Sequence, residues 1–234
     1  MFCKGNSLDF LKKIVLETEN SFSTKLRKKR FILFNNLIST VSKPCRILDV
    51  GGRQIFWELM DFNLSSEVEI DLYNIENIEV SLPNLKHIVG DVRDMKRFRD
   101  NEYDIVFSNS LIEHVGDFES QKRVAKEIRR IGKRYFVQTP NLYFPIEPHF
   151  VFPFFQYFSP ELRVFFIRTF NVGVKNKISD KKEAIQAANR IRLLSERELK
   201  ELFPKASIFK EKFLSITKSF IVYDGWNEDE KSQL

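Results

Sequence analysis

The sequence predicts an α/β fold in which helices cover both faces of a mostly parallel sheet. The first observation is the stretch from Arg46 to Trp57, where a short apolar run stops at Gly51–Gly52 and an amphipathic stretch follows. A buried first strand that turns over a ligand into its helix has this pattern, because glycine lets the backbone approach closely. The second is the alternation of strand and helix patterns through the first half of the chain. The third is the continuous apolar run Ile105–Phe107, which suits a parallel strand covered on both faces.

Hydrophobic periodicity places the elements along the chain. Residues 8–20 and 22–43 have apolar side chains at helical spacing, and Pro44 ends the second helix. The predicted strands span 46–50, 67–76, 86–91, 103–109 and 134–139, with two late strands at about 206–213 and 217–223, and the predicted helices between them span about 54–61 and 117–131. A loop with a helix is expected over 175–192. Ser195 with Glu198 forms a capping box that predicts the start of a last helix.

Composition argues against several broad classes of protein. The apolar fraction of 43% is ordinary, and no uncharged apolar run of ~18 residues occurs that could span a membrane. The N-terminus lacks a secretory apolar region, so we expect a cytoplasmic protein. Cys3 and Cys45 have neither metal-ligand spacing nor a disulfide framework, and no metal site is expected. The net charge of +6 is weak evidence for nucleic acid. The basic run at 25–30 is interpreted as a solvated helix face, with contact to an anionic substrate or a membrane surface as the alternative.

Polar residues follow the strand bodies at one edge of the predicted sheet. Ligands bind outside the carboxyl ends of the strands in such sheets, so these residues are expected to form one cofactor-sized crevice. They are Gly51 and Gly52 at the first strand, Asp71, Asn74 and Glu76 at the second, Asp91 at the third, Ser108, Asn109, Ser110, Glu113 and His114 at the fourth, and Thr139, Pro140 and Asn141 at the fifth. An acidic residue one strand over from the glycine turn can accept hydrogen bonds from ribose hydroxyls.

Four segments, in order along the chain, resemble a known family. They are Ile47–Gly52, Val89–Asp91, Tyr103–Asn109 and Leu111–Val115. Over about residues 45–141 the sequence resembles the class I S-adenosylmethionine-dependent methyltransferases, in the branch often labelled type 11. The resemblance implies a Rossmann-like, doubly wound, seven-stranded sheet with the last strand antiparallel. It also implies an enzyme whose cofactor is S-adenosyl-L-methionine.

The resemblance further implies roles for the crevice residues. These are Gly51 and Gly52 under the cofactor, Asp91 with the Val92 amide at the adenine, and Ser108 and Asn109 beside the methionine portion. The ribose is held by Asn74 or Glu76, or else by Asp71. The number of residues from Asp49 favours Asp71 as the ribose ligand. The point at which the alternation of apolar and polar residues in the second strand ends favours Asn74 or Glu76. The turn departs from the family's usual Gly-x-Gly-x-Gly, because residues 51–54 read Gly-Gly-Arg-Gln.

Histidines are the candidates for a general base. Methyl transfer from a sulfonium mainly needs a positioned acceptor and exclusion of water, although an oxygen or nitrogen acceptor can need a base. His149 lies in the segment after the fifth strand, where the acceptor is expected, and Glu147 can tune its charge. We therefore expect Asn141, Glu147 and His149 to bind substrate, with His149 and His114 as catalytic candidates. Ordinary packing or loop roles are the alternatives for both histidines, and His87 is interpreted as structural.

A Phe-rich segment follows the fifth strand. It has nine Phe residues between 144 and 170, and its prolines argue against a continuous helix. It is expected to be either a core or lid layer over the sheet or an apolar cap for a lipid-linked acceptor or membrane-surface contact. We divide a single methyltransferase domain, 1–234, into N-terminal helices (1–44), a cofactor-binding half (45–141), a Phe-rich cap or insertion (142–193) and a C-terminal helix and strand pair (194–234).

The leading functional hypothesis is methyl transfer to a small-molecule or glycan/lipid-intermediate acceptor, at oxygen or nitrogen. The alternative is a catalytically silent cofactor-binding protein of the same fold, which the altered glycine turn supports. A dehydrogenase is disfavoured because no Gly-x-Gly-x-x-Gly follows the first strand. A nucleic-acid partner is not expected, because no Asn/Asp-Pro-Pro-Tyr tetrad follows the fourth strand.

Overall fold

A single sheet organises the chain. The computed structural model describes residues 22–62, 67–147, 149–172 and 176–227, and the helix predicted over 8–20 lies outside them. The sheet has seven strands in the order β3-β2-β1-β4-β5-β9-β8. They are β1 (Cys45–Val50), β2 (Val68–Asn74), β3 (Leu85–Val89), β4 (Tyr103–Asn109), β5 (Gly132–Pro140), β8 (Ser207–Phe213) and β9 (Ile216–Asp224). The first five run parallel, and β9 runs antiparallel to both β5 and β8. The predicted mostly parallel sheet with an antiparallel last strand is confirmed.

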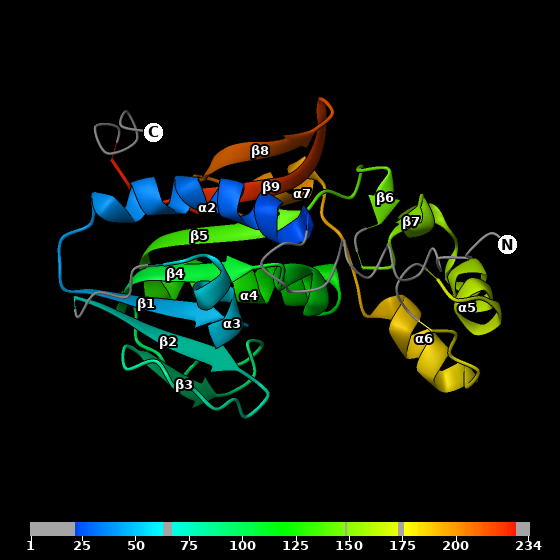
Figure 1. Cartoon of the computed structure of the whole chain (residues 1–234), viewed down its shortest axis with the longest axis horizontal. Coiled ribbons are helices and arrows are strands. Elements are labelled where there is room, and N and C mark those ends of the chain that lie inside the picture. Colours follow the sequence, from blue (N-terminus) through cyan, green and yellow to red (C-terminus); the bar gives the residue numbers. More distant parts are fainter. Residues whose placement is uncertain (1–21, 63–66, 148, 173–175, 228–234) are drawn as a thin grey trace, which may run out of the picture.

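Helices cover both faces of this sheet, as Figure 1 shows. On one face, α2 (Phe22–Ser39) and α3 (Gln54–Leu59) pack over the strands. On the other face lie α4 (Phe118–Ile131) and α7 (Glu196–Leu202). The helix predicted over 22–43 ends earlier, at Ser39, where the Thr40 amide bonds to the Leu37 carbonyl in a turn. The residue before a proline avoids helical conformation, so Lys43 cannot continue the helix, although this does not fix its end at Ser39.

Aromatic side chains fill the core under α2. The Phe34 ring lies 4.9 Å from the Phe107 ring and 5.2 Å from the Phe136 ring, centroid to centroid. Phe107 and Phe136 stack on neighbouring strands at 5.5 Å. Full burial of each such side chain contributes about 1.5–3 kcal/mol. This packing holds β1, β4 and β5 in place, and their carboxyl ends form the site.

The Phe-rich segment breaks into short elements, as its prolines predicted. It forms the hairpin β6 (Ile146–Glu147) and β7 (Phe152–Pro153), the 3₁₀ turn η2 (Phe155–Tyr157), α5 (Pro160–Thr169) and α6 (Lys181–Asn189). Its buried side chains form a hydrophobic cluster separate from the two on the sheet faces. The chain then enters α7 through the predicted capping box, in which Ser195 and Glu198 exchange hydrogen bonds.

The insertion, residues 142–193, leaves the sheet and returns to it at one point. Asn141, just after β5, bridges to Leu194, and the Leu142 amide donates to the Leu194 carbonyl at 3.0 Å. Figure 1 shows β6, β7, α5 and α6 beyond the carboxyl ends of the parallel strands. The insertion therefore borders the edge where polar residues gather. Among the described residues, no helix is both long and apolar enough to cross a membrane.

Candidate active site

The glycine turn after β1 is braced by the next strand. Gly51 has a φ of +81°, which glycine adopts without strain, and its amide donates to the Tyr73 carbonyl at 2.8 Å. The side chain of Asn74 donates to the Gly52 carbonyl at 3.2 Å and lies 3.4 Å from that of Gly51. A Cβ at Gly51 would lie 2.7 Å from a methyl group of Leu111. The turn is therefore held against both β2 and the segment after β4.

A buried carboxylate lies under the second glycine. A Cβ at Gly52 would lie 2.0 Å from an Asp49 carboxylate oxygen, so no larger residue fits there without a shift. The same carboxylate accepts a hydrogen bond from the indole of Trp57 at 2.8 Å. Burial raises the pKa of Asp49 to about 7, and the Trp57 hydrogen bond opposes part of that rise.

The three ribose candidates occupy different positions. Asp71 lies within β2, where its carboxylate accepts from Tyr103 at 2.7 Å and from Arg46 at 3.1 Å. Asn74 ends β2 and braces the glycine turn. Glu76 lies beyond the strand end, exposed, and forms an ion pair with Arg53 at 2.7 Å. Of the two acidic residues, Glu76 is the one beside the turn, whereas Asp71 is committed to partners in the sheet.

Asp91 follows β3 and bonds to Arg93, through both the Arg93 backbone amide and its guanidinium. The Arg93 hydrogen bonds hold the pKa of Asp91 below its ordinary value. Val92 is half-buried against the sheet-face cluster. The Tyr73 hydroxyl lies 3.1 Å from the Asp91 carbonyl, which ties the β3 end to β2.

Ser108 and Asn109 end β4. The Ser108 side chain is fully buried, and its Oγ has no hydrogen-bond partner among the described residues. Such an unpaired buried hydroxyl costs free energy unless a ligand satisfies it. Asn109 is half-buried, and after it Ser110 adopts a φ of +54° with its hydroxyl bonded to Gln138 at 2.8 Å. The β4 end therefore turns sharply at the crevice.

Two histidines and two carboxylates meet beside this turn. Glu113 and His114 lie on the 3₁₀ turn η1 (Ile112–His114), and His149 comes from the insertion. The two imidazole rings contact edge to face, 4.7 Å apart. His149 Nδ1 lies 2.7 Å from Oε1 of Glu147, and His149 Nε2 lies 3.8 Å from Oε1 of Glu113. Thr139 at the end of β5 donates to Oε2 of Glu113 at 3.0 Å. The fold thus joins residues from β4, β5 and the insertion.

Both carboxylates of this cluster are buried. Glu113 is fully buried, and burial raises its pKa to about 6. Glu147 is 3% exposed and accepts from the Phe150 amide at 2.6 Å as well as from His149. Because a carboxylate oxygen accepts the His149 hydrogen bond, Nδ1 of His149 carries a proton, and in the neutral ring Nε2 has the lone pair.

Asn141 is placed at the base of the insertion. Its side-chain amide donates to the Thr217 carbonyl at 2.7 Å and its side-chain oxygen accepts from the Tyr143 amide at 3.0 Å. With 5% exposure, its polar atoms are committed to the backbone. Asn141 thus fixes the start of the insertion to β9 through hydrogen bonds to the backbone. Among the described residues, its side chain makes no hydrogen bond to Glu147 or His149.

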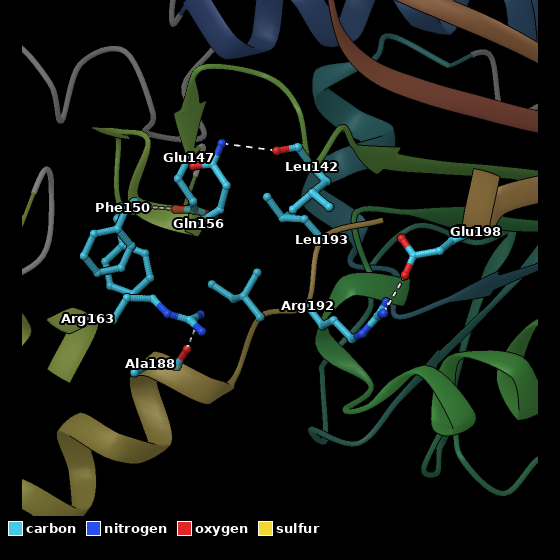
Figure 2. Close-up of a pocket in the computed structure, with 11 residues that line it drawn as sticks. Leu142, Glu147, Phe150, Gln156, Arg163, Ala188, Arg192, Leu193 and Glu198 are labelled. Atoms are coloured by element: carbon cyan, nitrogen blue, oxygen red, sulfur yellow. Dashed lines mark hydrogen bonds and ion pairs between the residues drawn. The ribbon is translucent and has the colours of Figure 1, made fainter. Parts of the chain in front are cut away.

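A cavity of about 240 Å³ lies within the insertion, with Glu198 of α7 on one side (Figure 2). Its lining combines apolar side chains with a few charged ones, as ligand sites do. The lining residues used below are Glu147, Phe150, Phe155, Arg163, Arg192 and Leu193. Figure 2 shows Arg163 and Arg192 on opposite sides of it. Arg192 bonds to Glu198 at 2.5 Å, and Arg163 bonds to the Ala188 carbonyl at 3.1 Å.

Residues 46–135 match a family model described as a methyltransferase domain. Over these residues the chain is similar to methyltransferase domains. This match covers the strands that supply the glycine turn, Asp91 and the β4 end. A methyltransferase domain agrees with S-adenosyl-L-methionine, the cofactor that the sequence resemblance implies. No curated protein matches the chain by sequence.

Solved structures share the methyltransferase fold. A SAM-dependent methyltransferase from Aquifex aeolicus is 12% identical, with a TM-score of 0.50 over 92% of this chain and 96% of that one. The PH0226 protein from Pyrococcus horikoshii OT3 is 15% identical, with a TM-score of 0.51 over 91% of this chain and 94% of that one. The CurJ carbon methyltransferase is 8% identical, with a TM-score of 0.54 over 94% of this chain and 66% of that one. At these identities the similarity is one of fold.

Two features of the strand-end edge agree with S-adenosyl-L-methionine, the cofactor that the sequence resemblance implies. A Cβ at Gly51 or Gly52 would collide with Leu111 or Asp49, so packing keeps glycine at both positions of the turn. The unpaired Ser108 hydroxyl offers a buried polar contact at the same edge. The turn lacks the further glycines of the usual motif, but it retains Gly51 and Gly52, the two that local packing requires.

Sequence reasoning missed several residues of this site. The sequence places Glu113 among the polar residues after β4 but assigns it no role, although an acidic residue beside a histidine there was a usable signal. Arg163 and Arg192 carried no signal, because they meet only through the packing of the insertion. The support that Asp49 gives to the glycine turn was also missed, since it depends on a tertiary contact.

Proposed function

We propose that the protein is an S-adenosylmethionine-dependent methyltransferase that methylates an oxygen or nitrogen atom of a small acceptor, bound in the cavity between the insertion and α7. We propose a glycan or lipid intermediate as the class of methyl acceptor. The observation that carries the proposal is that Glu147 both lines this cavity and bonds to His149. The acceptor space therefore lies next to Glu147, which holds the Nδ1 side of the His149 ring.

For the cofactor, we propose the roles that the crevice positions support. Gly51 and Gly52 pass beneath it, and Glu76 binds the ribose, since Asp71 is already paired with Arg46 and Tyr103. The other proposed contacts are Asn74 as a brace of the turn, Asp91 and Val92 at the adenine, and Ser108 and Asn109 beside the methionine portion. Arg53 would then release Glu76 when the ribose binds, because the Arg53–Glu76 pair is exposed and weak.

The chemistry divides between cofactor and protein. The cofactor supplies an activated methyl group: the acceptor atom bonds to the methyl carbon as the carbon–sulfur bond breaks, and the electron pair stays on the sulfur of S-adenosylhomocysteine. The protein has to place the acceptor and handle its proton. We assign acceptor activation to His149, with Glu147 as the positioning residue that holds its ring. His114 packs edge to face on His149 and limits its rotation.

The cavity is lined by two arginines and two glutamates, and Arg163 is the side chain that suits a negative group on the acceptor. Arg163 has a buried Nε atom without a hydrogen-bond partner among the described residues. Arg192, across the cavity, shares its charge with Glu198. A guanidinium is suited to carboxylate or phosphate because its donors are arranged as a fork. The apolar walls at Phe150, Phe155 and Leu193 suit a hydrophobic portion of the same molecule.

The surface of the insertion supports a lipid-linked acceptor. Several large apolar side chains of this segment are exposed, namely Tyr143, Ile146, Phe154, Tyr157, Leu162, Phe165, Phe170 and Ile185. Exposed aromatic and aliphatic side chains gathered on one segment are typical of contact with a membrane surface or another apolar partner. We include peripheral membrane contact in the proposal on this basis.

Two measurements test the proposal. Calorimetric titration with S-adenosylmethionine and S-adenosylhomocysteine should show one cofactor site per chain. Transfer of a labelled methyl group to a cell extract, separated by anion exchange, should place the label in an anionic product. Label confined to neutral products would contradict the charge assignment. Cofactor binding without any transfer would favour the catalytically silent alternative, which the altered glycine turn supports.

His149 is tested separately. In His149→Asn we expect turnover to fall by about 100-fold or more, within the range for loss of a general base, while cofactor affinity stays unchanged. Unchanged turnover would exclude His149 from acceptor activation.

A further inference from the structure

The cluster beside the β4 turn has the donor set of a metal site. Glu113, His114 and His149 each offer one ligand atom, and the three atoms lie within 4.8 Å of one another. In a tetrahedral zinc site with bonds of about 2.1 Å, ligand atoms lie roughly 3.4 Å apart. The measured 3.8 Å between Glu113 Oε1 and His149 Nε2 is close to that separation.

The buried carboxylate gives a second, independent indication. Glu113 Oε1 is fully buried and has no hydrogen-bond partner among the described residues, while Oε2 is held by Thr139. A buried carboxylate oxygen without a donor is costly unless a cation or a donor satisfies it. This unsatisfied atom faces the Nε2 side of His149.

Neighbouring groups orient two of the three candidate ligands, His149 and Glu113. Glu147 accepts from Nδ1 of His149 and so leaves Nε2 as the coordinating nitrogen, the arrangement in which a carboxylate supports a metal-bound histidine. The backbone around Glu113 is also held, because its carbonyl accepts from the Arg192 amide at 2.8 Å. The buried Gln121 side chain donates to the Ile112 carbonyl at 3.0 Å. The site is thus partly preorganised by the protein.

We propose that Glu113, His114 and His149 bind a divalent transition-metal ion, such as Zn²⁺ or Co²⁺, beside the acceptor cavity. Two imidazoles and one carboxylate favour these ions over Mg²⁺ and Ca²⁺, which prefer oxygen ligands. Three protein ligands leave a coordination position open for an oxygen or nitrogen of the acceptor. The ion would lower the pKa of that group, and its proton would pass to bulk water.

This role for the ion rests on the proposed function, because it assumes that the acceptor occupies the adjoining cavity. His149 would then activate the acceptor as a metal ligand and not as a direct base. Binding of the ion itself can be measured without any acceptor, so the two proposals can fail separately.

The test is titration of the chelator-treated full chain with Co²⁺, followed by calorimetry and visible absorption. We expect one Co²⁺ per chain, with bands of nitrogen and oxygen ligands and no thiolate band. His114→Asn and His149→Asn should each weaken binding by more than about 100-fold, since loss of a ligand exceeds loss of a supporting residue. His87→Asn is the matched control, because His87 lies on β3, and should bind Co²⁺ as the unchanged chain does.

A second measurement uses the unchanged chain, so it tests the metal site even if a histidine variant fails to fold. Substoichiometric Mn²⁺ should broaden the imidazole proton resonances of His114 and His149 before those of His87. No Co²⁺ binding, or equal binding by all three histidine variants, would overturn the metal site. S-adenosylhomocysteine binding is measured alongside. Its absence with Co²⁺ bound would contradict the proposed function and leave the metal site standing.

Discussion

Glu147 Oε1 lies 2.7 Å from Nδ1 of His149, and this contact decides which nitrogen of the ring remains available. Both residues come from the insertion, and the carboxylate is almost fully buried. The pair reaches the sheet edge because β5 ends there and the insertion begins at once. The chemistry of the site therefore depends on how the insertion is seated.

The first expectation concerns this contact. In Glu147→Gln the ring loses its charged acceptor, so we expect turnover to fall about 10- to 100-fold while cofactor affinity is retained. Calorimetry with S-adenosylhomocysteine and methyl-transfer assays separate the two effects. Glu127→Gln, on α4 and paired with Arg130, is the matched control and should keep full turnover. Equal turnover in both variants would show that Glu147 has no positioning role.

The second expectation concerns the glycine turn. In Gly52→Ala the new Cβ meets the Asp49 carboxylate, so the turn must shift and cofactor binding should be lost. Overpacking of this kind costs about 1–3 kcal/mol in stability. Gly225→Ala is the control, since its Cβ would meet the Lys133 carbonyl at 2.5 Å at the far end of β9. It should lower the melting temperature without weakening cofactor binding. Intact cofactor affinity in folded Gly52→Ala would contradict the assignment of the turn.

The third expectation concerns pH and Asp49. The folded chain keeps the Asp49 proton up to about pH 7, whereas the unfolded chain releases it near the ordinary value of 3.8. The folded state therefore binds more protons between these values, so this contribution to stability falls as pH rises from about 4 to about 7 and then stays constant. The change is up to roughly 4 kcal/mol.

Asp49→Asn should remove that part of the pH dependence, as measured by urea unfolding at several pH values. Asp100→Asn alters a largely exposed side chain and should keep the slope of the unchanged chain. If Asp49→Asn shows the same slope between pH 4 and pH 7, the buried carboxylate is not its source.

The fourth expectation concerns the acceptor. Arg163→Met removes a cavity cation, so KM for an anionic acceptor should rise roughly 10- to 100-fold, as expected for a lost charged hydrogen bond. The KM for the cofactor should not change. Arg168→Met is a matched control, because Arg168 lies on the same helix and bonds to the Ser179 carbonyl away from the cavity. A rise in acceptor KM of the same size in both variants would point to loosening of the insertion as the cause.

The fifth expectation concerns the anchor of η1. Gln121 is fully buried and donates to the carbonyls of Ile112 and Arg192, at 3.0 and 2.9 Å. Gln121→Ala leaves these carbonyls unpaired, so we expect a loss of about 1–3 kcal/mol in thermal or urea unfolding. Lys122→Ala, at the neighbouring exposed position, should change stability by less than about 0.5 kcal/mol. Comparable losses in the two variants would contradict the anchoring role.

Local patterns were enough for most of the fold. The apolar run ending at Gly51–Gly52, the continuous strand at 103–109 and the capping box at Ser195 all depend on residues close in sequence. Each was confirmed, because periodicity and capping act over only a few residues. The end of α2 was predicted four residues late, since the pattern could not locate the turn after Ser39.

The sequence by itself therefore determined the sheet, its glycine turn and the polar residues at the strand ends. Only the tertiary structure decided which of those residues bond to internal partners and which remain available to a ligand. It committed Asp71 and Asn141 to internal partners, and it brought His149 to Glu113, which is 36 residues earlier in the chain. Long-range packing makes these choices, because the two sheet-face clusters and the seating of the insertion decide which polar groups remain unpaired.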